Sequence, residues 1–143
     1  MRPLGVTLIG YYQILRGLIS GLFGLSILAF AGLAAKLASL AAEGNAMQRL
    51  LSGFGHVAGF IILGAAVLHI AAGYGLLQMQ NWGRYLALLF SAIGLVTLLP
   101  FLHAFFPMVF AIINAVSIIY LVLPSTKRAF QYHDRDKPLR MAA

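Results

Sequence analysis

The chain has 143 residues, of which 62% are hydrophobic and 9% are charged, and it contains no cysteine. Soluble domains are about 45–50% apolar and about 25% charged, so a mean hydropathy of +0.93 predicts an integral membrane protein. The lack of cysteine excludes disulfide bonds, cysteine-ligated metal centres and a cysteine nucleophile. The formal net charge of +7 is gathered near the ends of the hydrophobic stretches, as is typical of charges that orient a membrane protein.

Four stretches are apolar over about 20 residues, the length that a helix needs to cross a bilayer. Asn81–Arg84 is predicted as the second turn, and Pro100 and Pro107 bracket the third. Connections this short favour antiparallel neighbours. The predicted fold is all-α, a single-domain antiparallel bundle of four transmembrane helices. The predicted spans are residues 4–35, 54–77, 85–101 and 104–123, the last ended by Pro124.

The connection from Lys36 to Gly53 repeats apolar residues at helical spacing. This pattern predicts a short interfacial amphipathic segment, made of two helical turns on the membrane surface that are hinged at Gly44 and Asn45. In the alternative interpretation, the connection merely continues the two flanking helices.

The positive charges predict the orientation, because cytoplasmic flanks are enriched in Lys and Arg. With four spans, both termini share one side, and the opposite side carries only Lys36 and Arg49. We therefore expect both termini in the cytoplasm. The basic tail, residues 125–143, is predicted to attract anionic lipid and has no feature of a nucleic-acid reader. The positive residues on the predicted cytoplasmic side are Arg2, Arg84, Lys127, Arg128, Arg135, Lys137 and Arg140.

Small residues form a stripe on each of the first two predicted spans. Glycine allows the backbones of membrane helices to approach closely, which is a principal source of their association. We therefore expect these spans to pack against each other, with a homo-oligomer or a partner helix as the alternative. The stripes contain Gly17, Gly21 and Gly24 on the first span and Gly55, Gly59 and Gly73 on the second.

Arg16 is the most unusual residue of the first span, since a charge deep in a bilayer costs several kcal/mol unless it pairs or reaches the interface. One interpretation makes it an interfacial anchor. The other makes it an anion or lipid-headgroup site, completed by Tyr12 and Gln13.

His69 lies near the centre of the second span, and small residues flank it at helical spacing. The first interpretation is a hydrogen bond to a neighbouring helix, through Asn114, Ser117 or Ser91. The second is a ligand to haem or (bacterio)chlorophyll, since a central histidine with small neighbours is typical of such ligands. Asn114 and Ser117 are predicted to bond other helices. Ser91 and Thr97 are predicted to bond their own backbone.

Chemistry-bearing motifs are scarce. His56 and His103 make a weak two-histidine pair without a carboxylate, so no metal site is predicted. The chain has three acidic residues and no phosphate-binding loop, zinc-protease motif or nucleophile elbow. An enzyme is therefore not expected. We predict a non-catalytic structural or accessory subunit of a larger membrane complex, photosynthetic or respiratory. The alternative is a small homo-oligomeric channel or transporter for an anion or a neutral amphiphile.

Several end and hairpin signals resemble a known group of proteins. They are the opening Arg2-Pro3-Leu4-Gly5-Val6-Thr7, the stretches Gly73-Tyr74-Gly75-Leu76-Leu77 and Asn81-Trp82-Gly83-Arg84, and the close Tyr120-Leu121-Val122-Leu123-Pro124 followed by Lys127-Arg128-Ala129-Phe130. Together they resemble uncharacterised small four-helix prokaryotic integral membrane proteins. The resemblance implies a prokaryotic plasma membrane or intracytoplasmic membrane location, and it implies no activity.

Overall fold

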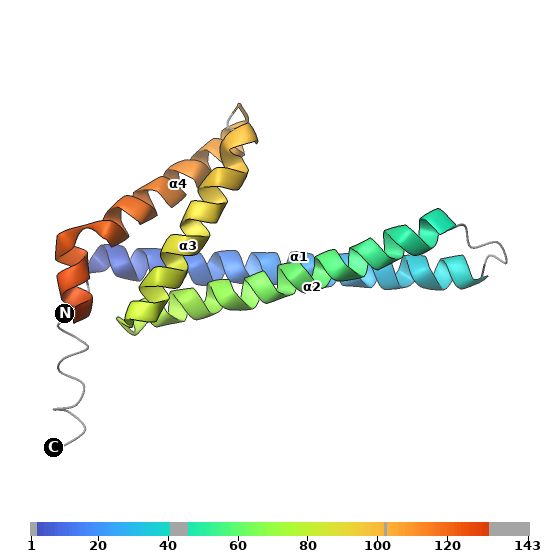
Figure 1. Cartoon of the computed structure of the whole chain (residues 1–143), viewed down its shortest axis with the longest axis horizontal. Coiled ribbons are helices and arrows are strands. Elements are labelled where there is room, and N and C mark those ends of the chain that lie inside the picture. The colour runs from blue at the N-terminus through green and yellow to red at the C-terminus, as the bar shows by residue number, and fades with distance from the viewer. Residues whose placement is uncertain (1–2, 41–45, 102, 132–143) are drawn as a thin grey trace, which may run out of the picture. The chain divides into compact units, whose positions relative to one another are not determined.

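A computed structural model describes residues 3–40, 46–101 and 103–131, and every regular element that they form is helical. The order of elements is α1 (Leu4–Leu40), α2 (Ala46–Leu77), α3 (Asn81–Leu98), a short 3-10 helix η1 (Leu99–Phe101) and α4 (Phe105–Val122) (Figure 1). The fold is therefore all-α, as the composition and the apolar stretches predict.

Four of these helices are long and apolar enough to cross a membrane. They correspond to Leu4–Leu37, Ser52–Leu77, Asn81–Phe101 and Phe105–Val122. Their number agrees with the four predicted stretches, and they are compatible with a multi-pass membrane protein. Most of their outward side chains are large and apolar, as expected where the surrounding solvent is hydrocarbon.

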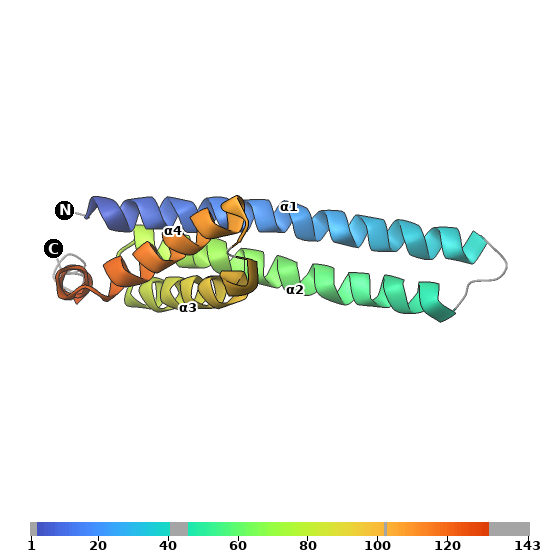
Figure 2. The same cartoon turned by 90° about the horizontal axis from the view of Figure 1, so that it is seen from above.

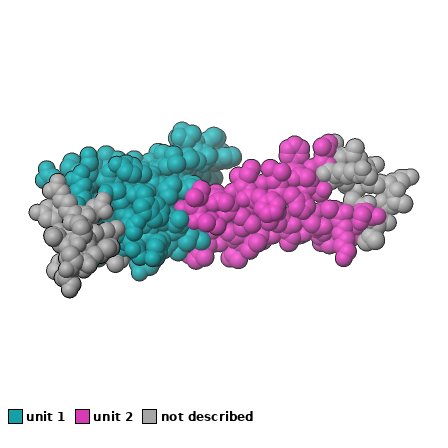
Figure 3. All heavy atoms as spheres, turned by 60° about the horizontal axis from the view of Figure 1, so that its bottom comes forward, with its two compact units in different colours: residues 1–14, 69–143 teal, residues 15–68 magenta. Residues whose placement is uncertain are grey.

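The chain forms two compact units. Residues 1–14 and 69–143 form unit 1, and residues 15–68 form unit 2 (Figure 3). Because α1 and α2 each contribute to both units, the sections of these helices are described unit by unit. The predicted single domain stays a prediction.

In unit 2, the sections of α1 and α2 pack through small residues. A Cβ atom added to Gly59 would lie 2.6 Å from the Leu28 side chain, and one added to Gly24 would lie 3.3 Å from the Gly59 carbonyl oxygen. Gly55 faces Ala31, where an added Cβ would lie 2.9 Å from the alanine Cβ. Glycine is therefore required by close approach here. The paired positions run in opposite order along the two helices.

The tightest contact differs in place from the centre of the predicted stripe. Gly17 is buried, but a Cβ added to Gly21 would make only an ordinary 3.6 Å contact with Ala66. Within unit 2, the closest backbone approach lies one turn further along α1, where Gly24 faces Gly59. The reason is that spacing places residues on one face of a helix but does not say where along that face the partner crosses it.

Unit 1 has a small apolar core near the connection between α2 and α3. A Cβ on Gly83 would lie 2.4 Å from the Gly75 carbonyl carbon, so the two backbones nearly touch. A Cβ on Gly73 would lie 2.6 Å from the Gly10 carbonyl oxygen. α3 and α4 also pack against each other. The buried core residues are Val6, Ile9, Ala72, Leu76, Met79, Ala87, Leu121 and Phe130.

The turn between α2 and α3 lies earlier than predicted. Asn81 to Arg84 form the first turn of α3, whereas the chain reverses at Gln78 to Gln80. Met79 supplies the left-handed conformation with φ 55°, and the Gln80 amide donates to the Gly75 carbonyl at 2.9 Å. The prediction was wrong because Gly83 serves helix contact rather than a turn.

α4 ends at Val122, and the next residue, Leu123, has ψ 135°. A proline disfavours helical backbone in the residue before it, so the predicted stop at Pro124 agrees with the structure. Residues 124–131 are helical again and run in a different direction from α4 (Figure 2). Thr126 and Phe130 are buried on one face of this segment.

The connection between α1 and α2 is described only in part, and the predicted hinge at Gly44 and Asn45 lies outside the described residues. The described flanks belong to the two helices, since α1 extends to Leu40 and α2 begins at Ala46. This arrangement matches the alternative in which the connection continues the helices.

Gly59→Ile should destabilise the protein by about 1–3 kcal/mol, because the added side chain overpacks the contact with Leu28. Gly64→Ile in the same helix is the matched control, since nothing lies within 4 Å of a Cβ at Gly64. The measurement is the midpoint of helix loss during titration with sodium dodecyl sulfate, followed by circular dichroism. Equal midpoints for the two variants would contradict the assigned contact.

Candidate functional site

A cluster of buried polar side chains lies in unit 1, contributed by three different helices. Gln13 comes from α1, His69 from α2 and Ser91 from α3. Gln13 and Ser91 are fully buried, and His69 is 6% exposed. A polar group removed from water must be hydrogen-bonded to avoid a penalty of about 1–3 kcal/mol, so the partners of these side chains decide what the cluster does.

Gln13 is the centre of the cluster. Its Oε1 lies 2.7 Å from His69 Nδ1, and because an amide oxygen only accepts, Nδ1 carries the proton in this bond. The Gln13 Nε2 donates to Ser91 Oγ and to the Ala87 carbonyl oxygen, both at 3.5 Å. The amide thereby links α1 to α2 and α3. These hydrogen bonds fix how the three helices are rotated about their own axes at this level.

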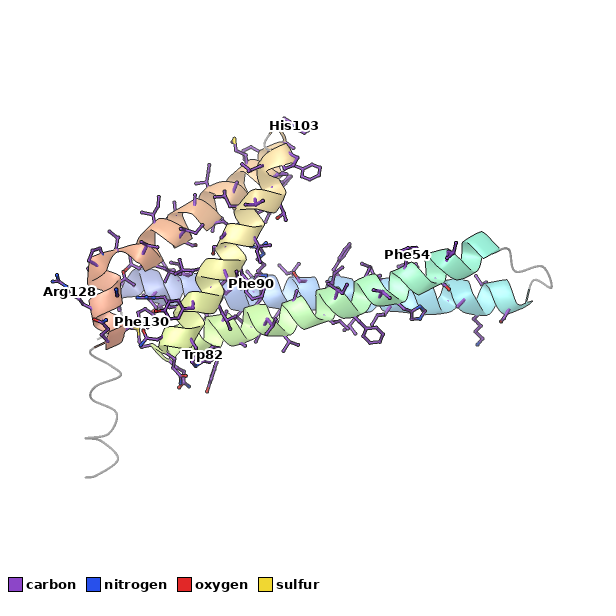
Figure 4. The ribbon with its side chains drawn as sticks, in the orientation of Figure 1. Phe54, Trp82, Phe90, His103, Arg128 and Phe130 are labelled. Carbon is purple, nitrogen blue, oxygen red and sulfur yellow. The ribbon has the colours of Figure 1, made fainter. Side chains whose placement is uncertain are left out.

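The His69 ring also packs on Phe90, with ring centroids 4.1 Å apart and planes inclined by 33°. Phe90 lies on α3, as marked in Figure 4. On the Gly73 side, α1 approaches so closely that no side chain fits. The hydrogen bond to Gln13 uses Nδ1 of His69, so a tetrapyrrole metal could be ligated only through Nε2. The predicted haem or (bacterio)chlorophyll site stays a prediction.

One partner of His69 is Gln13, which was not among the predicted Asn114, Ser117 and Ser91. Ser91 accepts from Gln13 rather than bonding only its own backbone. These differences have one cause: helical spacing gives the face on which a residue lies but not the neighbour that this face meets.

Three further polar residues lie on α3 and α4. Ser117 donates to the Ile113 carbonyl oxygen of its own helix at 2.7 Å, instead of bonding another helix as predicted. Thr97 bonds the carbonyl oxygens of Ile93 and Gly94, which confirms the prediction for that residue. Asn114 is fully buried in α4.

Tyr12 belongs to unit 1 and Arg16 to unit 2. Arg16 is half-buried and belongs to unit 2, whereas Gln13, its predicted companion, directs its amide to His69 and Ser91. Tyr12 lines a cavity of about 330 Å³ between α1 and α4, together with Ser117 and Tyr120. The Tyr12 hydroxyl is buried without a hydrogen-bond partner among the described residues. No lining residue of this cavity is charged, so it suits hydrocarbon better than an ion.

Arg84 is a site residue that the sequence analysis treated only as a topology charge. It lies in the first turn of α3 and is 7% exposed. Its Cζ is 5.1 Å from the centroid of the Tyr85 ring and 5.9 Å from that of Phe130. Its Nε and Nη1 atoms are buried and have no hydrogen-bond partner among the described residues. The scarcity of acidic residues is the signal that could have directed attention to it.

The two remaining described histidines, His56 and His103, belong to different units. The His56 Nδ1 lies 2.7 Å from the Ser52 carbonyl oxygen, one helical turn earlier. His103 is exposed in the connection before α4 (Figure 4). Within residues 3–40, 46–101 and 103–131, no three histidine, aspartate or glutamate side chains gather in a group that could hold a metal ion.

Comparisons with family models, with curated proteins and with solved structures find no match to this chain. The resemblance to small four-helix prokaryotic membrane proteins therefore stays a prediction. The function has to be argued from the cluster and from the surfaces that surround it.

A double-mutant cycle on Gln13→Leu and His69→Phe should give a coupling free energy of about 1 kcal/mol, within the range of interhelical hydrogen bonds in membranes. The phenylalanine keeps a ring against Phe90, so mainly the polar bond is removed. Thr97→Val is the control, because that hydroxyl bonds its own helix, and it should change stability by less. Additive effects of the two substitutions would show that the Gln13–His69 bond contributes nothing.

Proposed function

We propose that the chain is a non-catalytic integral membrane protein that serves as an accessory subunit of a larger membrane assembly. The proposal rests on the observation that buried polar side chains of the protein bond one another. Gln13, His69 and Ser91 bond one another inside unit 1. Side chains engaged in this way fix helix positions, and they leave little chemistry for a substrate.

The outward faces support the same proposal. Val96 on α3 and Ile119 on α4 are each 65% exposed, and Phe106 is 75% exposed. Large apolar side chains on several faces suit contact with lipid or with other transmembrane helices. The small-residue contacts at Gly24 and Gly59 are satisfied within the chain, so we assign partner binding to the Leu-, Ile- and Phe-rich faces of α3 and α4.

The membrane arrangement is part of the proposal. We place the four helices as an antiparallel bundle in a prokaryotic membrane with both termini in the cytoplasm. The opposite order of contacts along α1 and α2 and the excess of Lys and Arg near the termini support this orientation.

Catalysis and ion transport have less support. General acid–base chemistry and proton coupling usually use carboxylates, and residues 3–40, 46–101 and 103–131 contain no aspartate or glutamate. The cavity at Tyr12 is lined by uncharged residues. A transport role would therefore concern a neutral amphiphile rather than an ion.

The test is native mass spectrometry of the full chain, tagged and extracted from its own membrane in a mild detergent. We expect the tagged chain to emerge bound to at least one different membrane polypeptide. Replacing Val96 and Ile119 together by Ser should release that polypeptide while the helical circular dichroism is retained. The matched control, Val57 and Val67 to Ser in unit 2, should leave it bound.

Two outcomes would overturn the accessory role. Recovery of the chain only as a homo-oligomer would favour the amphiphile transporter, and recovery only as a bare monomer would contradict assembly altogether. A visible absorption band in the purified assembly that is lost in His69→Phe would assign a tetrapyrrole to His69.

A further inference from the structure

We propose that Arg84 is the binding site for a phosphate group, held at the beginning of α3 by its guanidinium group. This inference goes beyond the accessory role and does not depend on it. It rests on the buried, unpartnered nitrogen atoms of Arg84, on the aromatic rings beside them and on the uncapped end of α3.

The buried charge of Arg84 has an energetic cost. The guanidinium group stays protonated in proteins, and burying an ion without a counter-ion or hydrogen bonds is strongly unfavourable. Arg84 is 7% exposed, and its Nε and Nη1 have no acceptor among the described residues. The described part of the protein therefore leaves two nitrogen atoms, with three N–H donors, and a positive charge to be satisfied by something else.

Two aromatic rings contact the guanidinium group of Arg84. Tyr85 and Phe130 lie 5.1 Å and 5.9 Å from Cζ, within the range of cation–π contact. Such contacts stabilise the cation but accept no hydrogen bond in the plane of the guanidinium group. An oxyanion binds in that plane, and arginine matches phosphate oxygens with two parallel N–H donors.

The N-terminus of α3 also favours an anion. Arg84 is the fourth residue of α3, and Gln80 at the N-cap makes no side-chain capping bond. The Gln80 side-chain oxygen instead accepts from the indole N–H of Trp82. A helix N-terminus carries a partial positive charge and favours anions. The dipole and the guanidinium group thus have the same sign, and an anion would compensate both.

The described part of the chain contains no carboxylate that could pair with Arg84. The three acidic residues of the sequence are Glu43, Asp134 and Asp136, and all lie outside the described residues. Asp134 and Asp136 belong to a tail in which Arg135, Lys137 and Arg140 outnumber them. We therefore assign the anion to an external source.

The segment that contacts Arg84 carries further cations. Lys127 and Arg128 are exposed on the segment 124–131, whose Phe130 contacts Arg84. Figure 4 shows Arg128 directed outward from this segment and Phe130 on its inner side. Exposed cations near a membrane surface attract anionic lipid. A lipid headgroup and free inorganic phosphate offer the same group to Arg84, and the experiment separates them.

The experiment uses the full chain in a neutral detergent and native mass spectrometry to measure binding of phosphatidylglycerol and of phosphatidylcholine with identical acyl chains. Arg84→Gln should weaken phosphatidylglycerol binding at least tenfold relative to the wild type. Arg128→Gln removes the same charge from an exposed position and should weaken binding severalfold less. Phosphatidylcholine has the same phosphate diester but also a choline cation that offsets its charge, so it should bind all three proteins more weakly than phosphatidylglycerol binds the wild type.

A second measurement identifies the source of the phosphate. If inorganic phosphate raises the thermal midpoint of the wild type but not of Arg84→Gln, and phosphatidylglycerol does not, the site takes the free ion. If only phosphatidylglycerol does so, the site takes a lipid headgroup. Both results support the proposal.

Two results would overturn it. Equal loss of phosphatidylglycerol binding in Arg84→Gln and Arg128→Gln would reduce Arg84 to one surface charge among several. A loss of thermal stability in Asp134→Asn/Asp136→Asn that equals the loss in Arg84→Gln, and is not additive with it, would assign the counter-ion to the tail.

Arg84→Lys covers the case in which Arg84→Gln does not fold. Lysine keeps the charge but loses the paired in-plane donors, so phosphatidylglycerol binding should still fall at least threefold below that of Arg128→Gln. Unchanged binding in Arg84→Lys would contradict recognition by the guanidinium group. None of these measurements requires a partner polypeptide, so their failure is distinct from failure of the accessory role.

Discussion

The scarcity of carboxylates is the constraint on which the polar interior of this protein depends. No aspartate or glutamate occurs in residues 3–40, 46–101 and 103–131, so a buried polar side chain there must pair with a neutral group or with something outside. His69 and Ser91 pair with a neutral group, the side-chain amide of Gln13. Arg84 contacts two aromatic rings, and its Nε and Nη1 have no hydrogen-bond partner among the described residues, which is why we assign it an external anion.

Glycine determines where the helices meet. The backbones approach most closely at Gly24 and Gly59 in unit 2 and at Gly75 and Gly83 in unit 1. Dispersion forces fall steeply with distance, and hydrocarbon solvent provides no hydrophobic drive between helices. Close backbone contact therefore provides much of the attraction. In unit 1, the contact of Gly10 with Gly73 also brings α1 near enough for Gln13 to reach His69.

The proposed accessory role and the proposed phosphate site describe different parts of one molecule. The accessory role uses the apolar faces of α3 and α4, where residues such as Ile119 are exposed. The phosphate site uses the opposite kind of surface, at the beginning of α3 beside the segment 124–131. In the proposed membrane arrangement, the helices contact hydrocarbon along their length and headgroups at their ends, which requires both kinds of surface.

The sequence by itself determined the number of apolar helices and the end of α4, because these depend on length, composition and the local effect of Pro124. It also pointed to the glycine stripes and to His69 and Gln13 as candidate residues. Only the tertiary structure decided that Gln13 bonds His69, that Gly24 lies at the closest backbone contact of unit 2 and that Arg84 is buried. Those facts depend on how each helix is rotated and shifted against its neighbours, and the spacing of residues along one helix carries no information about either.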